Sequence, residues 1–302
     1  MKYIISGASG AIGYALIKKL ELENNEITVL INPASKRNSI FKLFTSVELI
    51  ECDLFSYSSV KIDQQYDVFI HMAWQGGGDR NNIAVNNSSA MMSVESVNLA
   101  NRLGCKTYIG TGSQAEYGYQ DKILDENTSC MPDTAFGAAK LSSFHFTQIR
   151  CNQLGMRHLW LRIGSIYGPF DRENTMLVST IRKVSNNILP LFSSGNQYWD
   201  FLYSDDLAEA MIGLVKKECS GLYVIGEGSS YTLKHYLKIL TKELNIDLRD
   251  SLAKDNTLDN SPQNNLRIDP KKLSSDILWT SSVDFNTGFK RLIKYCKENA
   301  PL

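Results

Sequence analysis

The feature that most constrains this chain is a glycine-rich turn near its first residue. Gly7, Gly10 and Gly13 follow the apolar run Tyr3–Ser6 and open the amphipathic segment Ala11–Leu22. In a strand–turn–helix of this kind, one glycine turns the chain, one lets an anion approach the backbone, and one packs the helix on the strand. The free N–H groups and positive dipole end of the helix attract a pyrophosphate. We therefore predict a dinucleotide site here. Its expected contacts are Gly7, Ser9, Gly10, Ala11, Ile12 and Gly13.

The first half of the chain alternates continuous apolar runs with amphipathic stretches. Such runs, rich in Ile, Val and aromatic residues, are typical of strands buried on both faces of a parallel sheet. The predicted strands are Tyr3–Ser6, Ile27–Ile31, Val47–Cys52, Asp67–Ala73, Thr107–Gly110 and His158–Ile163. The predicted helices are Ala11–Leu22, Ala84–Leu103 and Thr134–Leu154, with short ones in Lys36–Phe44 and Ser58–Gln64. Repeated βα units with right-handed crossovers predict an α/β fold, a Rossmann-type doubly wound parallel sheet.

The pattern changes after Gly168-Pro169. The predicted helices there are Asn174–Ser185, Asp205–Lys216, Thr232–Leu244 and Asn286–Lys297, the predicted strands are Trp199–Tyr203 and Leu222–Ile225, and Lys254–Asn265 reads as a loop. We predict a dinucleotide-binding domain over residues 1–167. A smaller α/β substrate-binding domain over residues 168–302 is expected to interleave with it.

Charge and composition argue against several classes of protein. The chain has 32 Lys and Arg against 32 Asp and Glu, so it lacks the basic excess of nucleic-acid or membrane-surface binders. No apolar run reaches the roughly 18 residues of a membrane span, and the first residues do not read as a signal peptide. Six scattered Cys without a C-x-x-C pair and four dispersed His indicate reduced thiols, a cytoplasmic location and no metal site.

Further motifs match one known family in the order in which that family carries them. They are Cys52-Asp53-Leu54, His71-Met72-Ala73-Trp74, Leu161-Arg162, Tyr167-Gly168-Pro169, Asp200-Phe201-Leu202-Tyr203 and Arg267-Ile268-Asp269. On these residues the sequence resembles the extended short-chain dehydrogenase/reductases, the NAD(P)-dependent epimerase/dehydratase family that modifies nucleotide-linked sugars. The resemblance implies a homodimer and a nucleotide-linked sugar as substrate. It also implies cofactor contacts from Asp53, Leu54, Met72, Ala73, Trp74 and Ile163.

The end of the second predicted strand bears on the choice of cofactor. NAD-preferring sites place an acidic residue there for the ribose 2′-OH, but this strand ends at Asn32 and Lys36 and Arg37 follow. Cations at that place favour a 2′-phosphate. We therefore expect NADP(H), with Asn32, Lys36 and Arg37 beside the ribose. NAD(H) is the alternative if Lys36 and Arg37 are a solvated loop pair.

The resemblance also implies a catalytic Ser or Thr, Tyr and Lys. Ser113 stands at the first position and Lys140 at the last, where it also contacts the cofactor ribose. A spacing of four residues puts the Tyr and Lys positions on one helical face, and the ammonium lowers the pKa of a phenol. The Tyr position, however, holds Phe136, which has no ionisable group.

Three interpretations of Phe136 remain open. The chain is a variant of a parent with Tyr, or another group is the acid, or the protein binds NADP(H) and a nucleotide sugar without catalysis. The candidate groups for the second interpretation are Tyr117, Tyr119, Glu116 and a water held by Ser113.

The reaction expected from the resemblance is a reduction. Dehydratases of the family carry Asp-Glu after the catalytic Thr, whereas Gln114-Ala115 follow Ser113 here. A reductase consumes NADPH, which agrees with the cofactor expectation. We predict reduction at C4 of a 4-keto nucleotide-linked sugar, with 4-keto-6-deoxy sugars among the candidates, for surface-polysaccharide synthesis. Epimerisation at C4 with bound NAD is the alternative.

The expected substrate contacts combine the strand end with basic and aromatic residues farther along. Trp199 stands where family members often have an Arg, and with Tyr203 it either stacks on a base or packs in the core. Arg172 and Arg267 either hold a diphosphate or are surface charges. The full expected set is Ser113, Gln114, Tyr117, Arg172, Trp199, Tyr203 and Arg267.

Overall fold

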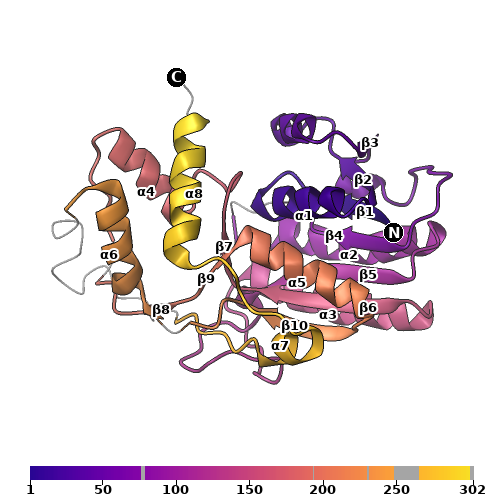
Figure 1. Ribbon diagram of the computed structural model, residues 1–302. Helices are drawn as coiled ribbons and strands as arrows, with labels where there is room; N and C mark the ends of the chain where they lie inside the picture. The colour runs from indigo at the N-terminus through magenta and orange to yellow at the C-terminus, as the bar shows by residue number, and fades with distance from the viewer. Residues whose placement is uncertain (76–78, 193, 230, 248–264, 300–302) are drawn as a thin grey trace.

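A parallel sheet forms the larger lobe of the molecule in the computed structural model, which describes residues 1–75, 79–192, 194–229, 231–247 and 265–299 (Figure 1). Its seven strands lie in the order β10-β6-β5-β4-β1-β2-β3, and every pair is parallel. They are β1 (Lys2–Ser6), β2 (Glu26–Ile31), β3 (Val47–Glu51), β4 (Val68–His71), β5 (Thr107–Ser113), β6 (Arg157–Ile163) and β10 (Gly221–Ile225). The predicted doubly wound sheet is confirmed.

Two helices cover each face of the sheet. Helices α1 (Ala11–Leu22) and α5 (Ser204–Lys216) pack together on the front face in Figure 1, and α2 (Ile83–Arg102) and α3 (Ala135–Gln153) pack together behind it. The sheet is therefore apolar on both sides. Burial on both faces was expected for every strand and is wrong for β3, which is half exposed because it is an edge strand.

The chain after residue 168 contributes to both lobes. It returns to the sheet through α5, which lies on α1, and through β10, which pairs with β6. The smaller lobe, on the left in Figure 1, contains α4 (Met176–Ser185), α6 (Leu233–Leu244) and α8 (Phe285–Glu298) around an aromatic core. The assignment of separate binding roles to residues 1–167 and 168–302 stays a prediction.

Some predicted elements differ from those observed. No helix occupies Ser58–Gln64. The 3-10 turn η2 (Leu54–Ser56) ends before this segment, and the segment itself is turn and coil. The expected strand Trp199–Tyr203 is broken at Asp200, whose buried carboxylate accepts the N–H groups of Glu227 and Gly228. The short helix expected in Lys36–Phe44 is present as the 3-10 helix η1 (Lys36–Leu43). Elements not predicted or divided differently are η3 (Gln114–Glu116), β7 (Ser165–Tyr167), β8 (Tyr198–Trp199), β9 (Phe201–Tyr203), β11 (Tyr231–Thr232) and α7 (Lys271–Ile277). The expected loop Lys254–Asn265 falls outside the described residues except for Asn265.

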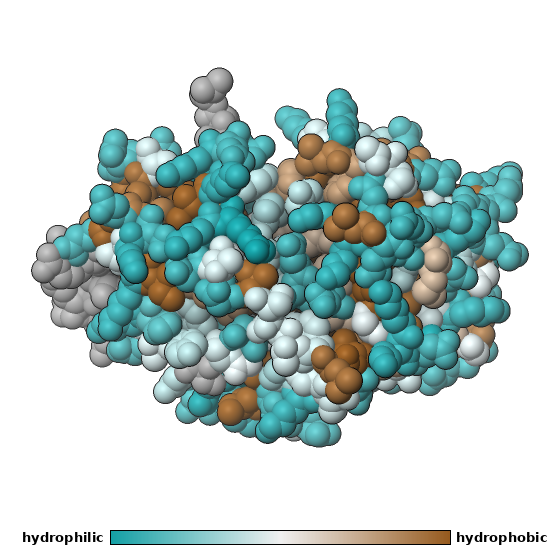
Figure 2. All heavy atoms as spheres, viewed as in Figure 1, coloured by the Kyte–Doolittle hydropathy of each residue, from teal (hydrophilic) through white to brown (hydrophobic). Residues whose placement is uncertain are grey.

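The surface seen in Figure 2 is mostly hydrophilic, with apolar side chains in small separate groups. Within the described residues, none of the helices has the length and hydropathy needed to cross a membrane. The same part of the chain gathers no group of three or more His, Cys, Asp or Glu that would suit a metal ion.

Candidate active site

Three adjoining cavities follow the carboxyl ends of the strands. The β2 cavity lies at the end of β2, the turn cavity at the glycine-rich turn, and the β5 cavity at the end of β5. Trp74 lines all three, so they adjoin around this side chain, and we refer to them together as the groove. The groove lies where the strand order reverses about β1, the place where open α/β sheets bind their ligands.

The glycine-rich turn has the geometry of a pyrophosphate cradle. Gly7 has φ +75°, and a Cβ there would lie 2.3 Å from the backbone nitrogen of Ala73. A Cβ on Gly13 would lie 2.1 Å from the carbonyl oxygen of Ala8. A Cβ on Gly10 would instead point into the turn cavity, with Arg37 Nη2 at 3.9 Å as its one neighbour within 4 Å.

The first turn of α1 is therefore open to an anion. Gly10 is its N-cap and offers no side-chain cap, so the backbone N–H groups are free to bind a ligand. All of the predicted turn residues line the turn cavity: Gly7, Ser9, Gly10, Ala11, Ile12 and Gly13. These residues fit the diphosphate of a nicotinamide dinucleotide.

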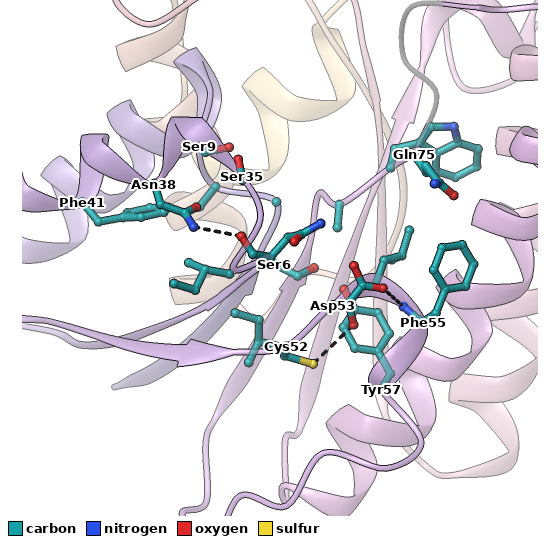
Figure 3. Close-up of a pocket in the computed structure, with 18 residues that line it drawn as sticks. Ser6, Ser9, Ser35, Asn38, Phe41, Cys52, Asp53, Phe55, Tyr57 and Gln75 are labelled. Atoms are coloured by element: carbon teal, nitrogen blue, oxygen red, sulfur yellow. Dashed lines mark hydrogen bonds between the residues drawn. The ribbon is translucent and has the colours of Figure 1, made fainter.

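The β2 cavity has polar walls suited to an adenosine half. Asn32, Asp53 and Leu54 line it as predicted, and Ala73 and Trp74 close it toward the turn. Figure 3 shows Ser9, Ser35 and Asn38 across the cavity from Asp53 and Phe55. The Asp53 carboxylate accepts the N–H of Phe55 at 2.9 Å, and the Asn38 amide donates to the carbonyl of Asn32 at 2.8 Å.

Lys36 and Arg37 do not line the β2 cavity, contrary to the expectation. The Ser35 hydroxyl caps η1 by accepting the N–H of Arg37, so the helix carries both side chains toward the other side of the turn. Arg37 donates to the carbonyl of Phe170 at 2.5 Å and lines the turn cavity. Lys36 lines a further cavity beside it, with Arg182 and Cys296. The argument for a 2′-phosphate therefore lacks support from the structure.

The β5 cavity brings the expected catalytic positions together. Ser113 ends β5 and caps η3, because its hydroxyl accepts the N–H of Ala115 at 3.2 Å and the Glu116 carboxylate accepts the N–H of Ser113 at 2.9 Å. This capping box fixes the side chain and leaves the hydroxyl free to donate. The other predicted residues that line the cavity are Ile12, Met72, Trp74, Gln114, Phe136, Lys140, Ile163 and Arg172.

Lys140 is buried at the back of the β5 cavity. Its Nζ donates to the carbonyl oxygen of Thr111 at 2.7 Å and lies 3.9 Å from the centroid of the Trp74 ring. Burial lowers the pKa of Lys140 to about 7, although the nearby Glu116 carboxylate raises it. A face of the Trp74 indole therefore covers a lysine that is poised to titrate near neutral pH.

Phe136 forms the aromatic wall of the cavity. Its ring meets Trp74 edge to face at 5.8 Å, and the Arg80 guanidinium lies 5.3 Å from its centroid. The Phe136 N–H also donates to the Arg80 carbonyl at 2.8 Å. Trp74 is held in turn by its own N–H, which donates to Asn86 at 3.0 Å. The ring is thus fixed in place without a phenol oxygen.

The side chains expected from the sequence as alternative acids do not reach the β5 cavity. Glu116 is fully buried and forms an ion pair with Arg162 at 2.7 Å. Tyr117 is also buried and donates its hydroxyl to the carbonyl of Asp125 at 2.7 Å, and burial raises its pKa. Tyr119 is 46% exposed and is not among the lining residues. Tyr117 was also an expected substrate contact, and the structure places it in the core instead.

Three further expected substrate contacts lie away from the groove. Tyr203 packs edge to face on Tyr167 in the core of the smaller lobe, and Trp199 packs on Phe201. Arg267 donates to the carbonyl of Asp121 at 2.9 Å. Arg172, in contrast, lines both the turn cavity and the β5 cavity, as a residue that binds a diphosphate would.

The structure adds residues that the sequence reasoning missed. Ser35 and Asn38 line the β2 cavity, and their place just after a predicted strand end was an available signal. Arg80 lines the β5 cavity from a stretch without periodicity, so no sequence pattern singled it out.

The sheet, the phosphate cradle and the Ser113–Lys140 cavity define a class: dinucleotide-binding α/β enzymes of the short-chain dehydrogenase type. The chain belongs to the NAD dependent epimerase/dehydratase family, whose model matches residues 3–226. The family resemblance expected from the sequence is confirmed.

Curated relatives cover most of the chain at low identity. A dTDP-6-deoxy-L-talose 4-dehydrogenase (NAD(+)) of Aggregatibacter actinomycetemcomitans is 27% identical over an alignment of 259 residues, and the match covers 82% of this chain and 93% of that protein. A dTDP-glucose 4,6-dehydratase of Escherichia coli is 23% identical over 342 residues, covering 99% of this chain and 94% of that protein.

Solved structures share the fold over its whole length. A tyrosine-to-phenylalanine mutant of UDP-glucuronic acid 4-epimerase from Bacillus cereus, in complex with UDP-4-deoxy-4-fluoro-glucuronic acid and NAD, superposes with a TM-score of 0.85 at 20% identity over 99% of both chains. A UDP-glucose 4-epimerase of Thermotoga maritima with UDP-glucose gives a TM-score of 0.85 at 18% identity over 100% of both chains.

Proposed function

We propose that this protein is a 4-epimerase of a nucleotide-linked sugar that works with a bound nicotinamide dinucleotide. The observation that carries the proposal is the meeting of Ser113, Lys140 and the ring of residue 136 in one cavity that adjoins the phosphate cradle. When bound, the dinucleotide supplies reversible hydride transfer. Ser113 donates a hydrogen bond to the reacting oxygen at C4, and Arg172 holds the diphosphate of the substrate.

The choice of epimerisation over reduction follows from the cofactor. Reduction by NADPH rested on Lys36 and Arg37, and neither lines the β2 cavity. That cavity offers neutral polar groups at Asn32, Ser35 and Asn38, which suit an unphosphorylated ribose. We therefore propose NAD as the cofactor. The names of similar solved structures, several of them 4-epimerases with NAD, support the same choice.

A second candidate function is binding without catalysis. The observation in its favour is Phe136, because the expected proton donor is absent and the other acidic side chains named from the sequence lie outside the β5 cavity. Such a protein would bind the dinucleotide and the sugar without turnover.

One experiment separates these functions. Purified protein is incubated with NAD and a panel of UDP- and dTDP-linked hexoses, and the C4 epimers are resolved by chromatography or NMR. Interconversion of C4 epimers supports the proposal. Net consumption of NADPH with a 4-keto sugar would instead support the reductase. Ligand binding by calorimetry without turnover, in both the natural chain and Phe136→Tyr, would support the binding function.

The homodimer expected from the resemblance is also a proposal. Helices α2 and α3 expose apolar side chains, including Met91, Phe146 and Ile149, each more than half exposed. A partner covering them would bury this apolar surface. Light scattering on the natural chain and on Phe146→Glu tests it, and a monomeric mass for the natural chain would contradict it.

All six cysteines are free thiols, as suits the proposed cytoplasmic location.

A further inference from the structure

We propose that Lys140 is itself the proton donor and acceptor for the C4 oxygen of the sugar, in the role that a phenol at position 136 would have. This inference rests on the proposed function and goes beyond it, since it assigns acid–base chemistry to a residue whose expected role is to orient the cofactor ribose. It follows from the inventory of the β5 cavity, the surroundings of Nζ and the balance of protons.

The inventory leaves one group able to change its protonation state. Among the described residues that line the β5 cavity, the ionisable side chains are Arg80, Lys140 and Arg172. A guanidinium does not release its proton at any pH that a protein tolerates. The Ser113 hydroxyl donates a hydrogen bond but is too weak an acid to supply the proton. Lys140 is therefore the group there that can both give and take a proton.

Burial of Nζ favours the neutral amine, because little water reaches the nitrogen to solvate an ammonium. The Trp74 ring and Phe136 form an apolar wall, with Nζ 3.9 Å and 5.9 Å from their centroids. One N–H is used by the Thr111 carbonyl at 2.7 Å, so two positions on nitrogen remain for substrate. The ring faces attract a cation and oppose this effect in part, but burial is the largest influence on the pKa of Lys140 and lowers it.

The charges around Lys140 act in opposite directions. Glu116 on η3 favours the ammonium, but Arg162 on β6 already neutralises that carboxylate. His71 on β4 stays neutral, since burial lowers its pKa to about 3. Arg80 and Arg172 add positive charge along the cavity wall. The resulting pKa of Lys140, about 7, leaves amine and ammonium both abundant at neutral pH.

The proton balance is complete in both directions. In oxidation, the C4 hydroxyl gives its proton to the lone pair of Nζ, and the C4 hydrogen leaves with its electron pair for the oxidised nicotinamide dinucleotide. A C=O bond forms, and Nζ becomes an ammonium. In reduction, the opposite face of the ketone receives the hydride and the Lys140 ammonium returns the proton to oxygen. No other reactant is consumed.

Lys140→Arg is the sharpest variant, because arginine keeps the positive charge and the hydrogen bonds but does not release a proton. We expect dinucleotide affinity to stay within about threefold of the natural chain while single-turnover reduction of NAD falls by about 10²–10⁴-fold. Lys238→Met, on the exposed face of α6, is the matched control and should change neither value. Turnover retained in Lys140→Arg would overturn the inference.

A second measurement does not depend on activity. In protein labelled with ¹³C at lysine Cε, the resonance that Lys140→Met removes should titrate near pH 7, far below the roughly 10.4 of a lysine in a model peptide. The rate of single-turnover oxidation should rise with pH through the same midpoint. A Lys140 resonance that titrates above about pH 9 would overturn the inference, because the residue would then be an ammonium at neutral pH.

The outcomes for this inference and for the proposed function are distinct. Turnover by Phe136→Tyr but not by the natural chain would keep the proposed function and overturn the role of Lys140. Absence of turnover in both, on every sugar of the panel, would overturn both. Turnover by the natural chain that Lys140→Arg abolishes, with a titration near pH 7, supports both.

Discussion

The residue at position 136 shows how much one oxygen atom decides. Phe136 keeps the place, the helix face and the ring contacts of the expected tyrosine, with Trp74 and Arg80 on its two sides. It lacks only the hydroxyl, and with it the proton donor and a polar group in the cavity wall. The chemistry of the site then depends on what stands four residues farther along the helix, at Lys140.

Restoring the hydroxyl is therefore expected to have a modest effect. Since Lys140 already transfers the proton, Phe136→Tyr should raise turnover by less than the roughly 10²–10⁴-fold that a new acid–base group contributes. Epimer formation measured at several pH values checks this prediction. A gain within the full range would mean that the natural chain has no proton donor.

A buried ion pair of Glu116 and Arg162 lies beneath the site. Both side chains are almost fully buried, and Arg162 Nε lies 2.7 Å from Glu116 Oε2. The Trp160 indole N–H donates a further hydrogen bond to the carboxylate at 3.1 Å. Glu116→Gln leaves the Arg162 charge uncompensated, so we expect a loss of about 3–5 kcal/mol in the free energy of unfolding. Urea denaturation measures it. Glu218→Gln removes the exposed ion-pair partner of Arg157 and should lower the free energy of unfolding by less than about 1 kcal/mol.

At the scale of elements, the turn between β1 and α1 divides its glycines between packing and binding. Gly13 meets the backbone of Ala8, whereas Gly10 faces the turn cavity. Gly10→Ala should therefore fold normally but bind NAD at least about tenfold more weakly, or 1.4 kcal/mol. Gly13→Ala should lower the unfolding temperature. Calorimetry and thermal unfolding of both variants check this pair, and equal effects of the two changes would contradict it.

Strand and helix limits were predictable where a local pattern was continuous. The strands β1, β2, β5 and β6 follow apolar runs that remain buried on both faces in the sheet. Interruptions were not predictable, because they depend on distant partners. Asp200 breaks an apolar run since it binds backbone N–H groups 27 and 28 residues farther along the chain.

At the scale of the whole molecule, buried titratable groups set the response to acid. Burial lowers the pKa of His71 to about 3 and of His158 to about 4, and raises the pKa of Asp200 to about 7. Between about pH 6 and 4.5 the unfolded chain binds two protons on these histidines that the folded chain does not, and the folded chain binds one on Asp200. The unfolded state therefore holds about one more proton.

The free energy of unfolding should fall as the pH is lowered through this range, by about 1.4 kcal/mol per pH unit. Urea denaturation at a series of pH values measures the slope. His158→Phe, whose ring replaces an imidazole stacked between Tyr108 and Trp160, should reduce the slope toward zero. Stability that rises as the pH falls from 6 to 4.5 would contradict the neutral burial of both rings.

The sequence by itself determined the sheet, the phosphate turn and the order of Ser113, Phe136 and Lys140, because each depends on a local pattern or on spacing along one element. Tertiary structure alone decided which side chains from distant parts of the chain meet. Arg37 lies against Phe170, Trp74 covers Lys140, and Trp199 packs in the smaller lobe. The sequence does not distinguish a cation or an aromatic residue that lines a groove from one that packs in a core. The difference depends on residues that are distant in the sequence and that only the fold brings into contact.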